Sequence, residues 1–253
     1  MTAPTHRPLP DDPALAALGP EVRTAVALAW RRRARNELAT STVFADVTRA
    51  LVGIAAPLAI IRQAAEAVAD EVRHAEICVH VARAYWPECP SPEASPVVDA
   101  LAAPRGEGAE LATVLYVVIQ SCLNEGVASA YLQRCLTEAT SPLARAAVRD
   151  ILEDEIHHAR LGWSLLASDA LRPEWRAGVA EALPTLLERV ADAWTSESDA
   201  DLPVAPPGHG AIAPREMAGV VRDAYEDLVL PGFDRVGVAS GPARAWWAGR
   251  TWS

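Results

Sequence analysis

The pattern D-E-[V/I]-x-H-A occurs twice in the chain, as DEVRHA at residues 70–75 and as DEIHHA at residues 154–159. A second pattern, N-E-x-x-x-S, precedes each of them, as NELATS at 36–41 and as NEGVAS at 124–129. The glutamates of the two patterns, Glu37 and Glu71, are 34 residues apart in the first half, and Glu125 and Glu155 are 30 apart in the second. A duplicated helical hairpin is the simplest interpretation.

Apolar residues around these patterns recur with the 3.6-residue period of a helix over 20–52, 57–87, 107–138 and 142–170. The joins within each pair of stretches are short, which predicts two antiparallel hairpins. The proline-rich connector 87–108 is long enough to cross a bundle from end to end. Further helices are expected from about 173 to 194, bent or broken at Pro184, and from about 214 to 230. We therefore expect an N-terminal extension (1–19), a bundle (20–170) and a C-terminal helical extension packing on it (171–253).

The composition is that of one globular domain with a buried core, since 51% of the 253 residues are hydrophobic. Lysine is absent, and alanine makes up about a fifth of the chain, which favours helix. A formal net charge of -10 argues against a nucleic-acid partner. The apolar runs at 50–61 and 111–119 are shorter than the roughly 20 residues that span a bilayer, and the N-terminal residues do not resemble a signal peptide. We expect a cytoplasmic protein without a membrane partner.

The repeated patterns also predict a metal site. Residues three apart share one face of a helix, so each Glu-x-x-His presents a carboxylate and an imidazole to the same region. The helices are otherwise apolar here, and unpaired buried carboxylates would cost several kcal/mol each. A pair of divalent or trivalent cations would compensate them; the alternative is that the acidic residues lie on solvated helix faces. The candidate metal ligands are Glu37, Glu71, His74, Glu125, Glu155 and His158.

At these residues the sequence resembles the ferritin-like di-metal carboxylate superfamily, oxygenase or oxidase branch. That family takes one Glu from each of two helices and Glu-x-x-His from each of the other two. The resemblance covers about residues 20–170. It implies an all-α fold, a ferritin-like four-helix bundle built from two duplicated hairpins with a long crossover, to which the C-terminal helices are added.

The resemblance also implies a role for each residue. Asp70 and Asp154 would each accept the proton of a ligand imidazole from the opposite half and so fix its tautomer. The bridging carboxylates would take part in catalysis. The implied ligands are the terminal carboxylates Glu37 and Glu125, the bridging carboxylates Glu71 and Glu155, and the imidazoles of His74 and His158, one per metal.

Iron is the expected metal, because four carboxylates and two imidazoles suit five- or six-coordinate ions rather than tetrahedral zinc. Two Fe ions are expected, with Mn or mixed Mn/Fe as alternatives. Cys78 stands four residues after His74, where ribonucleotide reductase small subunits carry their radical tyrosine. Soluble methane monooxygenase hydroxylases are similar in having a cysteine there and a threonine where this chain has Ser129. This similarity makes Cys78 and Ser129 catalytic candidates, Ser129 as a proton relay; the alternatives are a small buried hydrophobe and a helix-packing residue.

The expected function is activation of O₂ to hydroxylate, N-oxygenate or desaturate a small organic substrate. Small side chains at 126–130 and at Ala159 and Gly162 are expected to leave room for it. An external electron donor, a ferredoxin or a reductase, is implied because no flavin or rubredoxin-like motif is present. The alternatives are an iron-handling ferroxidase, a manganese-catalase-like protein or a non-catalytic scaffold. Trp246, Trp247 and Trp252 are expected to pack on the parent domain or on the twin subunit of a homodimer.

Overall fold

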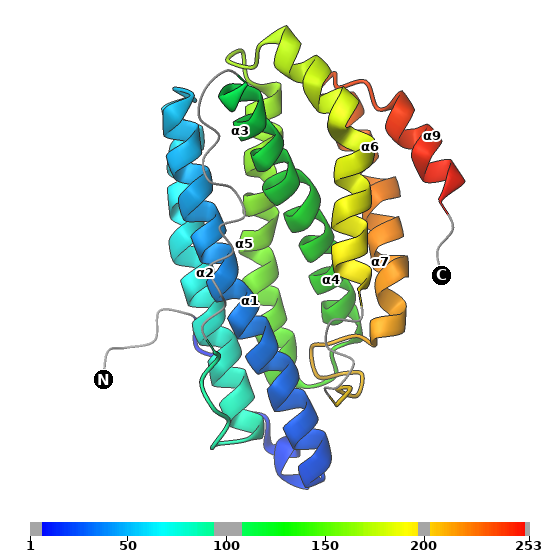
Figure 1. Ribbon diagram of the computed structural model, residues 1–253. Helices are drawn as coiled ribbons and strands as arrows, with labels where there is room; N and C mark the ends of the chain where they lie inside the picture. Colours follow the sequence, from blue (N-terminus) through cyan, green and yellow to red (C-terminus); the bar gives the residue numbers. More distant parts are fainter. Residues whose placement is uncertain (1–6, 94–107, 197–202, 251–253) are drawn as a thin grey trace.

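The computed structural model describes residues 7–93, 108–196 and 203–250, and every regular element within these ranges is a helix (Figure 1). The predicted all-α class is therefore confirmed. A short 3-10 helix, η1 (Pro13–Ala17), precedes the long helices.

The first hairpin consists of α1 (Pro20–Gly53) and α2 (Leu58–Tyr85), which pack along each other. Proline in the first turn suits the start of α1, because the N–H it lacks would have no partner there. The turn between the helices contains Ala55 in the left-handed conformation, with φ 52°. The N–H of Ala56 donates to the carbonyl of Leu51 at 3.0 Å, which closes the end of α1.

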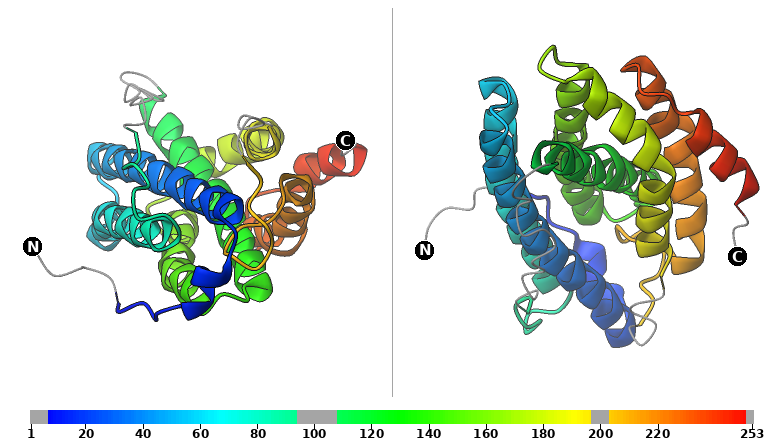
Figure 2. Two further views of the ribbon diagram at one scale, coloured as in Figure 1. Left: turned by 90° about the horizontal axis from the view of Figure 1, so that it is seen from below. Right: turned by 45° about the horizontal axis from the view of Figure 1, so that its top comes forward.

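The second hairpin is formed by a continuous helical stretch in three parts and by α5 (Pro142–Ala167). The three parts are α3 (Ala109–Val117), the π-helix η2 (Val118–Asn124) and α4 (Glu125–Glu138). The side chain of Ser141 caps α5 by accepting from the N–H of Ala144 at 3.2 Å. The two hairpins meet where α2 packs on α5, and their mutual arrangement is visible in both views of Figure 2.

The C-terminal helices cover the outer side of α3 and α4 (Figures 1 and 2). The helix α6 (Pro173–Thr195) continues through Pro184, so the helix is not broken there. The helix predicted over 214–230 extends further than expected, through η3 (Pro214–Glu216), α7 (Met217–Ala224), η4 (Tyr225–Val229) and α8 (Leu230–Arg235). In α9 (Gly241–Gly249), Trp247 packs on Tyr225 with the ring centroids 5.2 Å apart.

Trp246 and Trp247 belong to the same apolar cluster as the residues that α6, α7 and α8 bury, so they pack on the chain itself. Trp252 and most of the predicted crossover, residues 94–107, lie outside the described residues. The ferritin-like topology and the three-part division of the chain therefore stay predictions.

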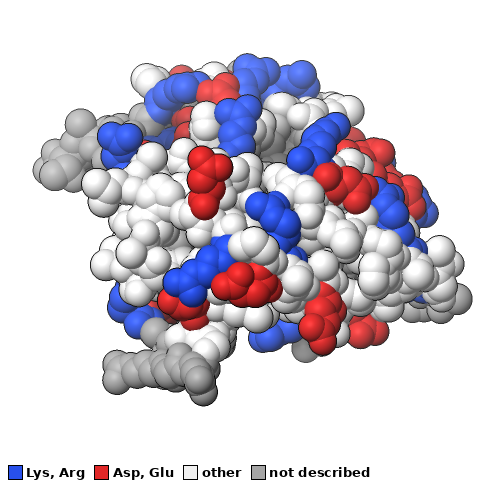
Figure 3. Space-filling model, turned by 90° about the horizontal axis from the view of Figure 1, so that it is seen from above, with Lys and Arg blue, Asp and Glu red and all other residues white. Residues whose placement is uncertain are grey.

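The stretch Ala109–Glu138 is long and apolar enough to cross a membrane by length and composition. Its most apolar window is 61% buried inside the protein, which is also what the core helix of a soluble protein shows. On the face of the molecule shown in Figure 3, arginine and carboxylate side chains are interspersed.

Candidate metal centre

Four helices bring the six predicted ligands to one place. Their ligand atoms form two groups, and within each group all the atoms lie within 4.8 Å of one another. Glu71 and Glu155 belong to both groups. Glu37 and His74 complete the first group, and the second is completed by two residues from the other hairpin, Glu125 and His158.

The two shared carboxylates lie between the two imidazoles. His158 Nδ1 is 3.1 Å from Glu71 Oε1 and 3.1 Å from Glu155 Oε2. His74 Nδ1 is 3.5 Å from Glu71 Oε2 and 3.3 Å from Glu155 Oε1. Each imidazole thus presents the same nitrogen to both carboxylates, and one carboxylate comes from each hairpin.

The outer nitrogen of each imidazole faces an aspartate of the opposite hairpin. His74 Nε2 is 3.2 Å from Asp154 Oδ2, and His158 Nε2 is 3.5 Å from Asp70 Oδ2. This is the cross-pairing that the resemblance implies. With the Nε2 proton donated to an aspartate, a neutral imidazole turns a bare Nδ1 lone pair toward the carboxylates, and such a pair of acceptors needs a cation between them.

Five of the six candidate ligands are almost fully removed from solvent, and Glu37 is half-buried. Glu71 and His74 are 0% exposed, and the exposed fractions of Glu125, Glu155 and His158 do not exceed 5%. Among the described residues, both carboxylate oxygens of Glu71 and Nδ1 of His74 lack hydrogen-bond partners. Buried charged groups without partners are costly, so these atoms fit a bound cation.

The pKa values of the glutamates reflect the crowding of negative charge in the cluster. Burial raises the pKa of Glu37 well above its usual range, and the charges of Glu71 and Glu155 raise it further. The pKa of Glu125 is raised by burial and by the same two carboxylates. Burial opposes ionisation of Glu155 as well, but the hydrogen bond from His158 and the positive charge of the two nearby imidazoles hold its pKa well below the usual value. Bound protons therefore compensate negative charge at this cluster, as a metal ion would.

The donor set is rich in oxygen. Four carboxylates and two imidazoles form oxygen-rich sites of high coordination number, whereas structural zinc prefers four nitrogen or sulfur ligands. The buried Glu and His groups could hold a metal ion. Glu71 and Glu155 contribute ligand atoms to both groups.

Arg73, which occupies the variable position of the first D-E-x-x-H pattern, supports the cluster in a way that the sequence analysis missed. Its guanidinium contacts Asp154 and lies 3.2 Å from Asp150 Oδ1. Asp154 is the aspartate that faces His74. A cation within the repeated pattern is the signal that could have pointed to this role.

Cys78 does not belong to either group of ligand atoms, and Ser129 stands one helical turn after Glu125 on α4. Cys78 is fully buried, and burial together with the charge of Glu37 raises the pKa of its thiol. Ser129 Oγ is buried and has no hydrogen-bond partner in the part of the chain that the structure describes. Their catalytic roles stay predictions.

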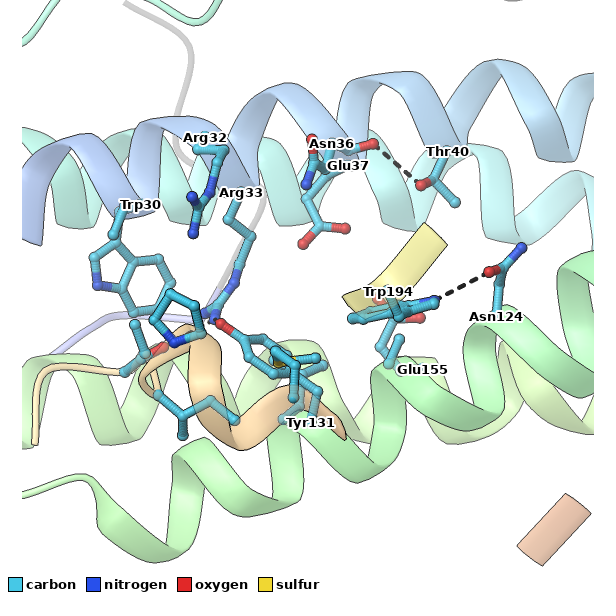
Figure 4. A pocket seen from close by; sticks show the side chains of 18 of the residues that line it. Trp30, Arg32, Arg33, Asn36, Glu37, Thr40, Asn124, Tyr131, Glu155 and Trp194 are labelled. Atoms are coloured by element: carbon cyan, nitrogen blue, oxygen red, sulfur yellow. Dashed lines mark hydrogen bonds between the residues drawn. The ribbon is translucent and has the colours of Figure 1, made fainter. Parts of the chain in front are cut away.

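A cavity of about 670 Å³ reaches the carboxylates from the space between α1 and α4 (Figure 4). It is lined by all four glutamates of the cluster, by the C-terminal part of α6 and by residues between Pro203 and Met217. Trp194 closes one side, and its Nε1 donates to Asn124 Oδ1 at 3.1 Å. A cavity of this size suits a small organic molecule.

The small residues near the cluster contribute less to this cavity than expected. Of the five residues at 126–130, Ala128 is among the lining residues. A Cβ on Gly126 would lie 3.4 Å from Val229 Cγ2, and one on Gly162 would lie 2.5 Å from Cys122 Sγ. Gly162 therefore serves close helix packing, whereas a Cβ on Gly126 would make an ordinary contact. Part of the cavity wall comes from the C-terminal segments, whose position no local pattern indicates.

No protein-family model, curated protein or solved structure matches the chain.

Proposed function

We propose that this chain is a non-haem di-iron carboxylate protein that activates O₂ to oxidise a small organic substrate, by hydroxylation, N-oxygenation or desaturation. The observation that carries the proposal is the pair of overlapping Glu/His groups at the floor of a substrate-sized cavity. In this proposal the four long helices form a ferritin-like bundle over residues 20–170. Manganese, alone or with iron, is the alternative metal.

The ligand roles follow the geometry. Glu71 and Glu155 are proposed to bridge two ions, because both carboxylates belong to both groups. Glu37 with His74 would complete one ion's shell, and the equivalent pair from the second hairpin would complete the other. When bound, a pair of redox-active ions supplies the electrons that reduce O₂, and an external donor such as a ferredoxin or a reductase replaces them.

The remaining residues hold the ligands and shape the reaction space. Asp154 and Asp70 accept the Nε2 protons and so keep each Nδ1 turned inward. Arg73 fixes Asp154 in place. Trp194 and residues between Pro203 and Met217 line the cavity and would shape the space for a substrate. Ser129 and Cys78 are retained as catalytic candidates on the grounds of sequence similarity.

The test is anaerobic loading with ferrous iron, followed by metal counting and measurement of O₂ uptake with and without an added reductant. The proposal expects about two irons per chain and rapid O₂ uptake. The double variant Glu71→Gln with Glu155→Gln should lose both. Its matched control replaces two exposed glutamates, Glu66→Gln with Glu181→Gln, and should keep both.

Three results would contradict the proposal. Absence of stoichiometric iron or manganese would remove the metal site. Accumulation of iron far beyond two per chain would indicate a ferroxidase that handles iron. Rapid disproportionation of H₂O₂ by the manganese-loaded form, without O₂ uptake by the iron form, would indicate a catalase-like protein.

A further inference from the structure

Arg33 lies one helical turn before Glu37 on α1, and both side chains point into the cavity (Figure 4). Its guanidinium carbon is 4.5 Å from the ring centroid of Trp30 and 5.2 Å from that of Tyr131. Nη2 donates to the Tyr131 hydroxyl at 2.8 Å and to the Gly210 carbonyl at 2.8 Å. The guanidinium is therefore held in a fixed position at the cavity wall.

The other terminal nitrogen of Arg33, Nη1, does not form such hydrogen bonds in the part of the chain that the structure describes. Nη1 is buried and lacks a hydrogen-bond partner among the described residues. Nor does the guanidinium form an ion pair with any carboxylate in residues 7–93, 108–196 or 203–250. Aromatic rings and neutral acceptors stabilise a buried cation only in part, so a positive charge in this position favours an anion beside it.

The four glutamates do not provide this anion in the loaded protein. In the proposed function their charges are matched by two metal ions, which leaves Arg33 as the unmatched charge beside the cavity. The wall around it is largely apolar and includes Leu132, Ala205 and Ile212, which are 3%, 8% and 8% exposed. Such a wall suits a hydrocarbon chain or ring rather than a second polar group.

We propose that the substrate is a small organic acid whose carboxylate binds Arg33 and whose apolar part extends toward Glu37 and the metal ions. This inference rests on the proposed function and names its substrate class. A guanidinium matches a carboxylate in shape and charge and can bind it with two parallel hydrogen bonds.

The competing explanation is that Arg33 only fastens the loop at Gly210 to α1. The two explanations differ in what the cavity binds. We would titrate the ferrous-loaded protein anaerobically with hexanoate and with phenylacetate, and each in parallel with its neutral amide, by calorimetry. Metal content would be measured in every sample.

Wild-type protein is expected to bind at least one acid about tenfold or more tightly than the amide of the same shape, as a charge-assisted hydrogen bond would provide. Arg33→Gln should remove this preference while the metal content stays unchanged, and Arg33→Lys should keep part of it. The matched control is Arg49→Gln, which removes an exposed arginine of the same helix that pairs with Asp46 at 2.9 Å. This control should bind the acid as the wild type does.

Equal binding of acid and amide by the wild type would overturn the inference, even if the Arg33 variants failed to fold. A preference for the acid that survives in Arg33→Gln would also overturn it. Failure of the proposed function is distinguishable, because it would appear as missing metal in the wild type. In that case the comparison of acid with amide still decides whether Arg33 binds a carboxylate.

Discussion

The two repeats of the molecule present the same candidate ligands in different surroundings. In the first repeat Glu37 lies on a regular α-helix, is half-buried and has Arg33 one turn before it. In the second, Glu125 is buried directly after a π-helix, and the position one turn before it holds Ser121. π-helical turns are frequent at functional sites because they re-aim side chains within a continuous helix.

The positions next to the histidines differ as well. One turn after His74 stands the buried Cys78, whereas one turn after His158 stands Gly162, against which Cys122 packs. Arg73 holds the aspartate that faces His74, but its counterpart His157 is exposed. In the proposed function the candidate ligands are duplicated because two ions would need a matched set. Their surroundings need not match, because helix packing and access to the cavity do not require symmetry.

The largest expected effect concerns the protons that the candidate ligands of both repeats release when a metal ion binds. The pKa values of Glu37, Glu125 and His158 are raised, and that of His74 is raised to about 10, so without a metal the cluster holds its protons more tightly than the free side chains would. Metal binding should release them, so metal affinity should rise by about tenfold per pH unit for each proton released. Metal titrations between pH 6 and 8 with a pH indicator would measure this. Affinity independent of pH would contradict it.

The next effect tests the glycine of the second repeat. Gly162→Cys copies the first repeat into the second and should lower the free energy of unfolding by about 3 kcal/mol, because α5 and η2 are in contact there. Gly126→Ala is the matched control. Its Cβ would make an ordinary contact with Val229, so the change should stay below about 1 kcal/mol. Urea unfolding of both variants would measure the two free energies of unfolding. Equal losses of stability would show that Gly162 is not a packing residue.

A smaller effect is expected from the aspartates. Asp154→Ala should lower metal affinity by about tenfold or more, because His74 loses the acceptor that fixes its tautomer. Asp70→Ala should cost less, since its carboxylate is farther from His158 and more exposed, with side-chain exposures of 36% for Asp70 and 26% for Asp154. Competition with a chelator would rank the two variants. A larger loss in Asp70→Ala would reverse the asymmetry described here.

The smallest effect separates Arg73 from its counterpart. Arg73→Gln should weaken metal binding a few-fold, by under about 1.4 kcal/mol, because Asp154 loses its support but keeps its contact with His74. His157→Gln should change nothing measurable, since that side chain is exposed. The same chelator competition applies. Equal effects in both variants would mean that Arg73 does not act through Asp154.

The repeated parts of the molecule are those that the sequence predicted best. Helical periodicity and proline positions placed the long helices to within a few residues of where they begin and end. The i,i+3 spacing of Glu71 with His74 and of Glu155 with His158 was enough to predict that they face one cluster, because helix geometry is local. The aspartates facing the imidazoles followed from the resemblance.

The cavity and Arg33 could not be predicted in the same way. The segment between Pro203 and Met217 has no periodicity, and its place over α1 depends on long-range contacts such as the hydrogen bond from Arg33 to Gly210. The π-helix before Glu125 leaves no sequence signal that differs from that of an α-helix. Small residues at 126 and 162 predicted open space, but glycine equally permits close approach of helices, and the structure uses Gly162 in this way.

The most direct test of the central claim is a crystal structure of the anaerobically iron-loaded protein, with anomalous scattering measured at the iron absorption edge. The account predicts two anomalous peaks per chain between α2 and α5, both in contact with Glu71 and Glu155, one beside His74 and the other beside His158. No peak at these residues, or one located elsewhere on the chain, would contradict it.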